Sequence, residues 1–199
     1  MTTIGTLTAT RETSSTRQRL IDAGYELFSR HGFHGVGLDQ VLRDAGVSKQ
    51  TFYNHFESKD ELALAVLARR SQDELCSFRQ MLDRFGGTDP RARLEALWDV
   101  LSDWFTAPDF RGCIFITAAA EFPQAHDPAH LAAAEHSRKV MALVAELAAA
   151  AGAPDPHHLA EQLMMLVDGA VIAKHVCGND RAADIARESA RLIVARHLP

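Results

Sequence analysis

Apolar residues along most of the chain recur at the spacing of an α-helix. From Leu20 to Phe28 they fall three or four residues apart, the period that places side chains on one face of a helix. Ser15, with Gln18 three residues later, has the spacing of an N-terminal capping box, and Gly32 marks the end of the segment. The pattern predicts a first helix from about residue 16 to residue 31.

Eight further helical segments follow from the same periodicity, separated by Gly, Pro and Ser residues that end or begin helices. No segment alternates apolar and polar residues with a period of two, so no strand is predicted. The expected helices cover about residues 38–45, 48–56, 58–85, 91–107, 112–122, 128–151, 157–177 and 182–197. The sequence therefore predicts an all-α protein of nine helices without internal repeats.

The composition suits a folded protein, because 47% of the 199 residues are hydrophobic and 24% are charged. Cys76, Cys113 and Cys177 are widely separated and form no CxxC pair, a usage typical of a reducing compartment. The Thr-rich start has neither the basic residues nor the apolar run of a secretion signal, and we expect a flexible arm there. Since apolar runs stop short of the ~18 residues of a membrane span, we expect a cytoplasmic protein.

Charge is divided unevenly along the chain, whose net charge is −5. Residues 1 to 70 contain nine Lys and Arg against eight Asp and Glu, and the remaining residues contain twelve against eighteen. A basic part joined to an acidic part is typical of a nucleic-acid module attached to another domain, although one excess charge is weak support by itself.

Residues 38 to 56 have the pattern of a helix-turn-helix motif, in which two short helices flank a turn that contains Gly46. The second helix of such a motif enters the major groove of DNA, so its outward side chains must bond bases and phosphates. With Phe52 turned inward, Gln50 and Asn54 would share the outward face, where amides can bond adenine edges. A solvated polar face of a short helix would look the same, so this pattern alone leaves both interpretations open.

The run from Gly46 to Leu62, GVSKQTFYNHFESKDEL, resembles the DNA-binding signature of TetR-type transcriptional regulators. The likeness extends from about residue 15 to about residue 66. It implies that the second helix of the motif contacts DNA and that a lysine at the start of the next helix reaches a phosphate. The DNA-contact residues implied by this resemblance are Lys49, Gln50, Thr51, Tyr53, Asn54, His55 and Lys59.

Two positions depart from the TetR-type pattern. Gly37 stands where the family commonly has Thr or Ser, so the cap of the helix over 38–45 offers no hydroxyl to a phosphate. Asp39 falls near the expected DNA surface, where a carboxylate repels phosphate unless Arg43 or a base amine pairs with it. We therefore expect one phosphate contact fewer at this end of the motif.

The resemblance implies that residues 1 to 60 form the DNA-binding domain and residues 61 to 199 an effector-binding and dimerisation domain. Small residues stand among branched apolar ones in the last two expected helices, which favours a four-helix bundle about a two-fold axis. A core within one chain would use the same residues. The residues expected at the homodimer face are Leu159, Leu163, Leu166, Val167, Ala170, Val171, Ala183, Ala186, Ala190 and Ile193.

An effector pocket needs an apolar wall with a few converging polar groups. The candidates are Trp98, Trp104, Phe105, Cys113, Thr117, Glu121 and His136, which favour a small apolar or aromatic effector. The Arg111 to Cys113 stretch also resembles family members that sense oxidants or electrophiles through a cysteine at a helix start. In that alternative the helix N-terminus and Arg111 would favour the reactive thiolate, whereas a buried, inert Cys113 is the simpler interpretation.

Ten histidines raise the question of metal sensing, but no run places three or four ligands at the spacing of a zinc site. His126 and His130 are four residues apart and His175 and Cys177 are two apart, and neither pair is diagnostic. The sequence also has no nucleophile elbow, Walker loop or HExxH motif. We therefore expect no metal, no cofactor and no enzymatic activity, and the run over 46–62 argues against a helical module that does not bind DNA.

Together these features predict a homodimeric regulator of transcription, most simply a repressor that a small-molecule effector releases from a palindromic, double-stranded DNA operator. Such an effector must bind the DNA-free conformation more tightly than the DNA-bound one. Repression and activation would leave the same sequence pattern.

Overall fold

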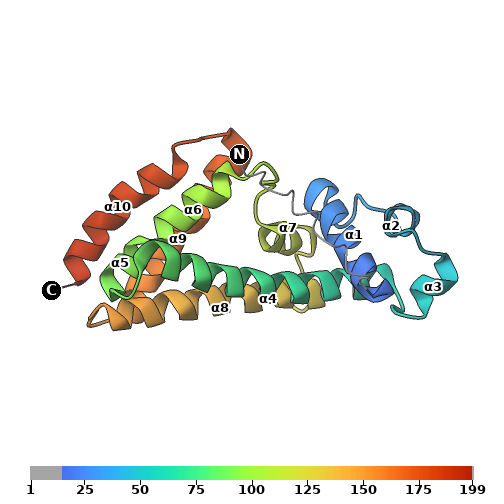
Figure 1. Ribbon diagram of the computed structural model, residues 1–199, viewed down its shortest axis with the longest axis horizontal. Coiled ribbons are helices and arrows are strands. Elements are labelled where there is room, and N and C mark those ends of the chain that lie inside the picture. The colour runs from blue at the N-terminus through green and yellow to red at the C-terminus, as the bar shows by residue number, and fades with distance from the viewer. Residues whose placement is uncertain (1–14, 199) are drawn as a thin grey trace, which may run out of the picture.

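The computed structural model describes residues 15 to 198, which form helices joined by short loops (Figure 1). Within this range no strand occurs, which confirms the predicted all-α class. The arm expected at the Thr-rich start lies outside the described residues. The helices are α1 (Thr16–His31), α2 (Leu38–Ala45), α3 (Lys49–Tyr53), α4 (Lys59–Gly86), α5 (Pro90–Glu95), α6 (Leu97–Thr106), α7 (Ile114–Glu121), α8 (Pro128–Ala150), α9 (Pro156–Cys177) and α10 (Ala182–His197).

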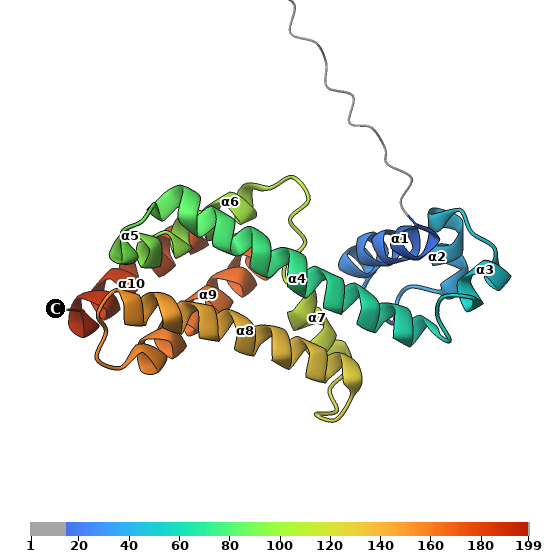
Figure 2. The ribbon, with the colours of Figure 1, turned by 60° about the horizontal axis from the view of Figure 1, so that its bottom comes forward.

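The molecule is elongated, with α1, α2 and α3 at one end and the later helices in a bundle at the other (Figure 1). Helix α4 runs from the first group into the bundle, where it lies beside α8 in both ribbon views (Figure 2). Helix α7 lies between the two ends. Two parts of the molecule are thus linked by one long helix and one short one.

The predicted helices match the observed ones except that α3 ends at Tyr53, before the expected residue 56, and that one segment is divided. The helix expected after Pro90 is split at Ala96 into α5 and α6, so nine expected segments correspond to ten elements in the described part of the chain. Ala96 keeps right-handed helical angles, with φ −64° and ψ −13°. The split is therefore a local irregularity in an otherwise helical stretch.

Side-chain caps fix where most helices begin. The hydroxyls of Ser15, Ser48 and Ser58 accept hydrogen bonds from the backbone N–H three residues later, at 3.2, 3.1 and 3.1 Å. An Asp-Pro pair starts three further helices, with the Asp carboxylate as cap and the Pro in the first turn, where its missing N–H costs nothing. These pairs begin at Asp89, Asp127 and Asp155.

Buried apolar side chains form two clusters. One cluster joins α1, α2 and α3 to the first part of α4, and it also contains Phe115 of α7 and Ala133 of α8. The other lies in the bundle of α4, α5, α6, α8, α9 and α10. Helix α4 contributes Leu62 to the first cluster and Leu82 to the second. The first turns of α7 and α8 therefore pack against the N-terminal helices rather than only within the bundle.

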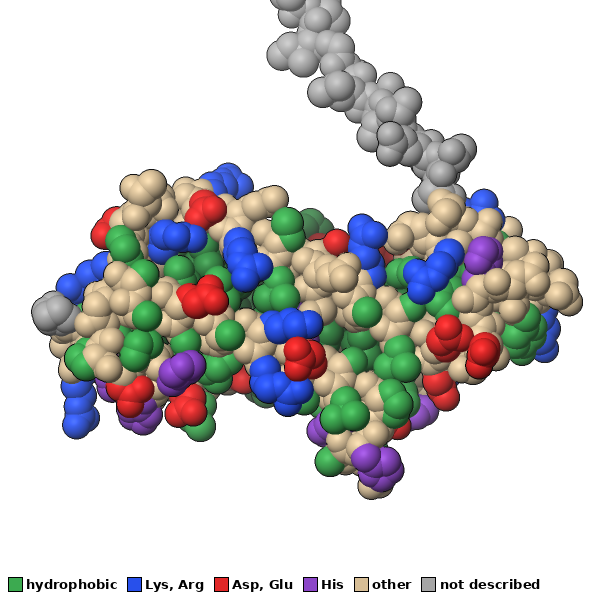
Figure 3. Space-filling model, turned by 90° about the horizontal axis from the view of Figure 1, so that it is seen from below, with side chains coloured by type: hydrophobic (Ala, Val, Ile, Leu, Met, Phe, Trp, Pro, Cys, Tyr) green, Lys and Arg blue, Asp and Glu red, His purple; other side chains and the backbone are tan. Residues whose placement is uncertain are grey.

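The surface carries both signs of charge. On the face shown in Figure 3, Lys and Arg side chains are interspersed with Asp and Glu, and hydrophobic side chains appear between them. The uneven division of charge along the sequence therefore does not produce a wide area of one sign on this face. From residue 15 to residue 198, none of the helices combines the length and apolar character needed to cross a membrane.

Candidate nucleic-acid interface and ligand cavity

The turn between α2 and α3 has helix-turn-helix geometry. Gly46 ends α2 with φ +64°, a left-handed conformation that glycine adopts without steric cost, and its N–H donates to the carbonyl of Arg43 at 3.2 Å. Phe52 and Phe56 are 0% and 2% exposed and anchor α3 to the N-terminal core. The opposite face of α3 is therefore turned outward.

Most residues implied as DNA contacts lie on this outward face: Lys49, Gln50, Tyr53, Asn54 and His55 are exposed. The ring of Tyr53 meets Phe52 edge-on, with centroids 5.3 Å apart, and still keeps 49% of its surface exposed. Nε2 of Gln50 lies 3.5 Å from Oδ1 of Asn54, a long contact that a base can replace. The two amides therefore form one polar patch, as their spacing predicts.

Thr51 is less available than its neighbours on α3. Its backbone N–H donates to the hydroxyl of Ser48 at 3.1 Å, and the two hydroxyl oxygens are 2.8 Å apart. The side chain is half-buried. Thr51 thus helps to cap its own helix, and a phosphate contact from its hydroxyl stays a prediction.

Lys59 has a different environment from the one that the resemblance implies. Its ammonium donates to the carbonyls of Phe33 and Val36, both at 2.8 Å, and so holds the loop between α1 and α2 against the start of α4. An ammonium has three N–H donors, and two of them are used here. The structure makes Lys59 a residue that positions the loop, and its contact with phosphate stays a prediction.

The start of α2 has the features expected from its sequence. Gly37 is the N-terminal cap and forms no side-chain hydrogen bond with the helix. Asp39 is exposed in the first turn, and no ion pair with Arg43 or another residue between 15 and 198 is formed. Its carboxylate therefore faces solvent near the outward face of the motif.

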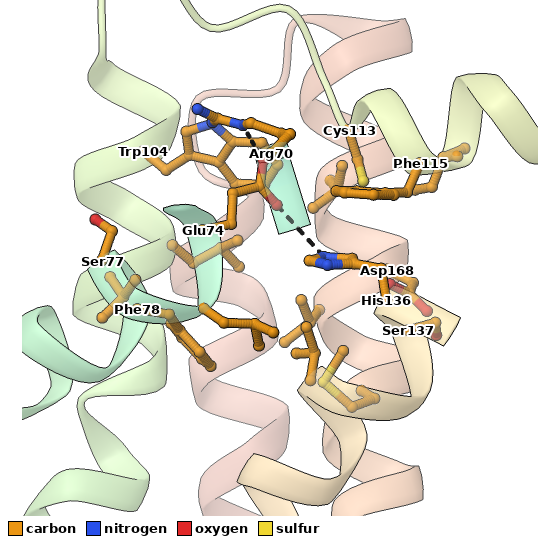
Figure 4. Close-up of a pocket in the computed structure, with 18 of the residues that line it drawn as sticks. Arg70, Glu74, Ser77, Phe78, Trp104, Cys113, Phe115, His136, Ser137 and Asp168 are labelled. Atoms are coloured by element: carbon orange, nitrogen blue, oxygen red, sulfur yellow. Dashed lines mark hydrogen bonds and ion pairs between the residues drawn. The ribbon is translucent and has the colours of Figure 1, made fainter. Parts of the chain in front are cut away.

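A cavity of about 610 Å³ lies in the C-terminal bundle, between α4, α6, α7, α8 and α9 (Figure 4). Its size suits a small organic molecule. The polar groups in its wall include Arg70, Glu74, Ser77, Cys113, His136, Ser137 and Asp168, and the apolar groups include Phe78, Trp104, Phe115, Val140 and Val171. The wall is thus mainly apolar, with polar groups on α4, α6, α8 and α9 and at the start of α7.

Three of the seven pocket residues expected from sequence line this cavity: Trp104, Cys113 and His136. Trp98 and Phe105 do not, and are 3% and 5% exposed within the apolar core of the bundle. They lie on the side of α6 that packs against other helices. The expectation for these two aromatic residues is corrected accordingly.

Thr117 and Glu121 also lie outside the cavity wall. The hydroxyl of Thr117 donates to the carbonyl of Cys113, one turn earlier in α7, at 3.3 Å. Glu121 is directed toward the N-terminal helices, as described below. Both residues are on α7, whose Phe115, Ile116 and Ala119 line the cavity instead.

No cavity residue on α4 or α9 was expected from the sequence, and those missed include Arg70, Glu74 and Phe78 on α4 and Asp168 on α9. The sequence predicts only a long helix over residues 58–85. A signal was present, because Arg70 and Glu74 are four residues apart with the spacing of a helical ion pair. Asp168 likewise interrupts an otherwise apolar stretch of α9.

The polar groups from α4 and α8 form one hydrogen-bonded network (Figure 4). Nε of Arg70 lies 2.5 Å from Oε1 of Glu74, and Oε2 of Glu74 lies 3.3 Å from Nε2 of His136. Nδ1 of His136 is 3.0 Å from the hydroxyl of Ser71. The His136 ring also stacks on Phe115, with centroids 3.6 Å apart.

Burial shifts the pKa of two groups in this network. It lowers the pKa of His136 to about 4, helped by the positive charges of Lys139 and Arg70, so the imidazole is neutral near pH 7. A neutral ring that donates from Nε2 to Glu74 accepts at Nδ1 from Ser71. Burial also raises the pKa of Glu74, against the lowering effect of Arg70.

Cys113 is the N-terminal cap of α7 and lines the cavity, but its thiol is not activated. Burial raises the pKa of the thiol to about 11, and the negative charge of Glu74 makes the second largest contribution. Arg111, which was expected to favour the thiolate, is exposed and donates to the carbonyl of Phe110. The raised pKa agrees with a buried, inert Cys113, the simpler of the two interpretations of the sequence, because burial outweighs the helix terminus.

The C-terminal end of α7 is bonded to the loop between α1 and α2. Oε1 of Glu121 accepts from the N–H of Phe33 at 3.1 Å, and Oε2 accepts from the N–H of His34 at 2.7 Å. The same carboxylate lies 3.0 Å from Nδ1 of His34. Since Lys59 binds the carbonyl of Phe33, the loop is held by a carboxylate on one side and an ammonium on the other.

The fit between this loop and Glu121 depends on Gly32. A Cβ added there would lie 2.2 Å from Oε1 of Glu121, and φ at this residue is +74°. The ring of Phe122 then packs against Phe33 and His34, with centroids 5.6 and 4.8 Å away. Helix α7 therefore contacts the cavity near its start and the N-terminal helices at its end.

Exposed apolar side chains form one face of α9 and α10: Met165, Ile172, Val176, Ile185 and Leu192 are between 43% and 77% exposed. This is not the face expected from the sequence. Leu159, Leu163, Ala170, Val171, Ala183, Ala186 and Ala190 are buried within the chain. The expected interface residues are thus mainly the contacts between the two helices and the rest of the bundle, and a different face is left uncovered.

Several histidines contact other protein groups. Nδ1 of His130 lies 2.9 Å from the carbonyl of Phe122, and the His158 and His197 rings meet edge-on. Across the described range, His, Cys, Asp and Glu side chains form no group of three or more that could hold a metal ion.

Comparisons with known proteins agree with this arrangement. Residues 20–66 match the family described as "Bacterial regulatory proteins, tetR family", and residues 90–190 match "Tetracyclin repressor-like, C-terminal domain". The fold is similar to that of a TetR-family transcriptional regulator from Streptomyces coelicolor, with a TM-score of 0.82 and 28% sequence identity over 92% of this chain and 95% of that one.

Two curated relatives are also similar. The transcriptional activator FasR of Mycolicibacterium smegmatis is 41% identical over 88 residues, which are 44% of this chain and 39% of FasR. The transcriptional repressor NemR of Escherichia coli is 28% identical over 135 residues, or 66% of each chain. The match to FasR thus spans less than half of that protein. Because both parts of the chain match and the C-terminal match alone covers half of it, the protein belongs to the TetR family of transcriptional regulators.

Proposed function

We propose that this chain is a homodimeric repressor that leaves a palindromic DNA operator when a small molecule enters the cavity of its C-terminal bundle. The observation that carries the proposal is the position of α7, which has Phe115 and Ile116 in the cavity wall and Glu121 on the DNA-binding end. A molecule in the cavity touches the same helix that holds the loop between α1 and α2. Because its partner is DNA, we infer a cytoplasmic location.

The outward face of α3 supports a specific division of roles. Gln50 and Asn54 are exposed side by side and can bond adenine edges in the major groove. Lys49, Tyr53 and His55 flank them and are suited to phosphates, with Thr51 at the helix start. In this proposal Lys59 acts mainly through the loop that it binds, and its remaining N–H is free for a phosphate.

The uncovered apolar face of α9 and α10 supports the homodimer. Five large hydrophobic side chains that stay exposed in one chain are buried when two copies pack through this face about a two-fold axis. Two copies of α3 would then read half-sites about one helical turn of DNA apart, or a multiple of it. The operator would be palindromic because the dimer is symmetric.

The link from cavity to DNA supports ligand response by population shift. An effector that displaces α7 changes the geometry at Glu121, and with it the loop that Lys59 ties to the start of α4. The two copies of α3 then lose the spacing that the operator demands. The effector must bind this displaced state more tightly than the DNA-bound state.

Sensing of oxidants or electrophiles through Cys113 is the second hypothesis. The likeness to NemR extends into the region that contains Cys113, and the thiol lines the cavity. The raised pKa of the thiol favours the small-molecule hypothesis, because the protonated form reacts slowly. Replacement of Cys113 by Ser distinguishes the two: oxidant-induced release from DNA would be lost only if the thiol is the sensor.

The first experiment is selection of bound sequences from random duplex DNA by the purified protein, followed by affinity measurements across a range of salt concentrations. The expected result is enrichment of a palindrome that binds with a steep salt dependence. A matched variant, Gln50→Ala, should bind with altered sequence preference, whereas the exposed Gln72→Ala on α4 should not differ.

Failure to enrich any sequence at low salt, with a sample that native mass spectrometry shows to be free of bound ligand, would contradict the proposal. If mass spectrometry instead detects a bound molecule, the selection is repeated after its removal by unfolding and refolding. Enrichment of a single, non-repeated half-site would contradict the symmetric dimer and leave DNA reading intact.

A further inference from the structure

The cavity has an excess of carboxylates. Four acidic residues contribute to its wall, Asp73, Glu74, Asp103 and Asp168, whereas Arg70 is the one Lys or Arg among the described lining residues. The neutral state of His136 near pH 7 adds no positive charge. A molecule that enters this cavity therefore meets a net negative surrounding.

The single cation of the wall is already occupied. The guanidinium of Arg70 is bonded to Glu74 at 2.5 Å and lies over the ring of Tyr25, 4.8 Å from its centroid. Glu74 in turn contacts Nε2 of His136 at 3.3 Å. An anionic effector would have to break this network to gain a counter-ion, at the cost of leaving a buried carboxylate without a partner.

Among the described residues of the wall, Asp168 is one of two carboxylates that lack a partner, the other being Asp103 on α6. Over residues 15 to 198 Asp168 forms no ion pair within 4.0 Å and no side-chain hydrogen bond, while Glu74 is paired with Arg70 and Asp73 with Arg69. Figure 4 shows Asp168 on the side of the cavity formed by His136 and Ser137. The side chain of Asp168 is accessible to solvent in the single chain, and the surrounding protein raises the pKa of its carboxyl by removing part of its hydration.

The rest of the wall suits an apolar body that carries positive charge. Trp104 and Phe78 present aromatic surface to the cavity, and aromatic faces attract cations. Aliphatic side chains from α8 and α9, among them Val140 and Val171, complete the surface. One carboxylate beside aromatic and aliphatic surface is the arrangement that binds an amine attached to a hydrophobic group.

We infer that the effector of this protein is a cationic amphiphile, an amine on an aromatic or aliphatic body, with Asp168 as its counter-ion. The inference rests on the proposed function for the meaning of the cavity, and it goes beyond it by naming the charge of the ligand. A neutral aromatic compound would fill the same space and leave Asp168 unpaired. A carboxylate would add a like charge to an acidic wall.

Calorimetric titration of the purified, full-length protein tests the inference. The probes are three matched sets, built on benzene, naphthalene and biphenyl, each with an aminomethyl, a hydroxymethyl and a carboxylate form. At neutral pH at least one amine should bind about tenfold more tightly than its matched alcohol, and the carboxylate should bind most weakly. Replacement of Asp168 by Asn should abolish the preference for amine over alcohol and leave alcohol binding unchanged.

Asp184→Asn is the matched control, since Asp184 is an exposed carboxylate on α10 that does not line the cavity. It should keep the preference. The inference is overturned if amine and alcohol bind equally, if none of the nine probes binds at millimolar concentration, or if the preference survives in Asp168→Asn. It is also overturned if that variant changes the oligomeric state in sedimentation, because Asp168 would then pair with a second copy of the chain.

The outcome is independent of the test by DNA selection. A protein that selects no operator but prefers amines through Asp168 would contradict the proposed function and support the charge assignment. A protein that selects a palindrome and shows no charge preference would support the proposed function and contradict the charge assignment.

Discussion

Oε2 of Glu121, at the end of α7, lies 2.7 Å from the backbone nitrogen of His34, a residue 87 positions earlier in the chain. The carboxylate also accepts from the N–H of Phe33. Because the opposite end of α7 lines the cavity, this contact links the cavity wall to the DNA-binding helices through one short helix, in addition to the link through α4, whose Arg70 lies over Tyr25 of α1. The strength of this contact should therefore affect how strongly a ligand in the cavity alters the DNA-binding helices.

Replacement of Glu121 by Gln is expected to weaken this coupling. The amide keeps one acceptor oxygen and loses one of two charge-assisted bonds, which should lower the free energy of unfolding by roughly 1 to 3 kcal/mol. The affinity for the selected DNA should change more than the affinity for a ligand in the cavity. Urea unfolding and DNA titration measure both effects.

Glu146→Gln is the control for Glu121→Gln, because Glu146 is exposed on α8 and lies outside the cavity wall. It should behave like the natural protein in both assays. An unchanged stability and DNA affinity in Glu121→Gln would show that the contact carries neither packing energy nor coupling.

Gly32→Ala is expected to disturb the same contact from the other side. A Cβ at this position both strains a backbone with φ +74° and lies 2.2 Å from the carboxylate of Glu121. The strain alone should cost roughly 1 kcal/mol, and displacement of the carboxylate should add to it. Gly87→Ala separates the two causes, because φ is +59° there and nothing lies within 4 Å of the added Cβ.

Thermal unfolding of the two glycine variants gives the comparison. The melting temperature should fall further for Gly32→Ala than for Gly87→Ala. Equal losses would mean that the backbone strain accounts for the whole effect and that Glu121 moves aside freely.

The sequence was informative wherever structure depends on local chemistry. Ser15, Ser48 and Ser58 cap helices through bonds to residues three positions away, and Gly46 ends α2 through its own backbone angles. These features need no information about the rest of the chain. The helices and the outward face of α3 were predictable for that reason.

The cavity and the uncovered face depend on how helices rotate against one another. Trp98 and Trp104 lie on one helix, yet only Trp104 faces the cavity, and the sequence is apolar on both sides of α6. Similarly, α9 has apolar residues on the side that contains Leu163 and on the side that contains Met165. Periodicity cannot choose between two apolar faces, because the choice is made by residues of other helices.

Substitutions on the N-terminal helices should separate direct DNA contacts from positioning residues. Lys49→Ala should weaken binding to every sequence and reduce the slope of log affinity against log salt by about 1, the value for one phosphate contact. Lys59→Met should also weaken DNA binding, but the slope of log affinity against log salt should change by less than 1. The reason is that the Lys59 ammonium is bonded to two carbonyls of the loop between α1 and α2 and so acts mainly by positioning that loop.

Urea unfolding provides the control for this pair. Lys59→Met should lower stability, since it leaves two carbonyls without donors, whereas the exposed Lys49→Ala should not. Identical salt slopes for both variants, together with normal stability of Lys59→Met, would place Lys59 on a phosphate instead.

Cys113 should be the slowest of the three cysteines to react with iodoacetamide. Its thiol pKa is raised to about 11 by burial, whereas Cys76 and Cys177 are exposed. At a pH near 8 the thiolate fraction falls tenfold for each unit by which the pKa rises, so Cys113 should react more slowly by roughly a hundredfold. Peptide mass spectrometry after timed alkylation reports all three rates in one sample, and equal rates would revive the oxidant-sensing hypothesis.

Acid should destabilise the fold through His136. Burial holds the pKa of this imidazole near 4, below its ordinary value of about 6.5, so only the unfolded chain binds a proton between these two pH values. Stability from the neutral ring is therefore complete above pH ~6.5 and is lost as the pH falls toward 4, by roughly 2 to 3 kcal/mol. Glu74 has the opposite sign, because burial raises its pKa and its protonation adds stability as the pH falls.

A His136→Gln variant isolates the histidine, since Glu74, Arg70 and Lys139 are retained in it. Urea unfolding near pH 7 and near pH 4.5 should show a smaller acid-induced loss of stability in this variant than in the natural protein. His157→Gln, an exposed histidine on α9, should leave the pH dependence unchanged. If His136→Gln loses as much stability in acid as the natural protein, the imidazole is already protonated when folded, and its contact with Glu74 is an ion pair between charged groups.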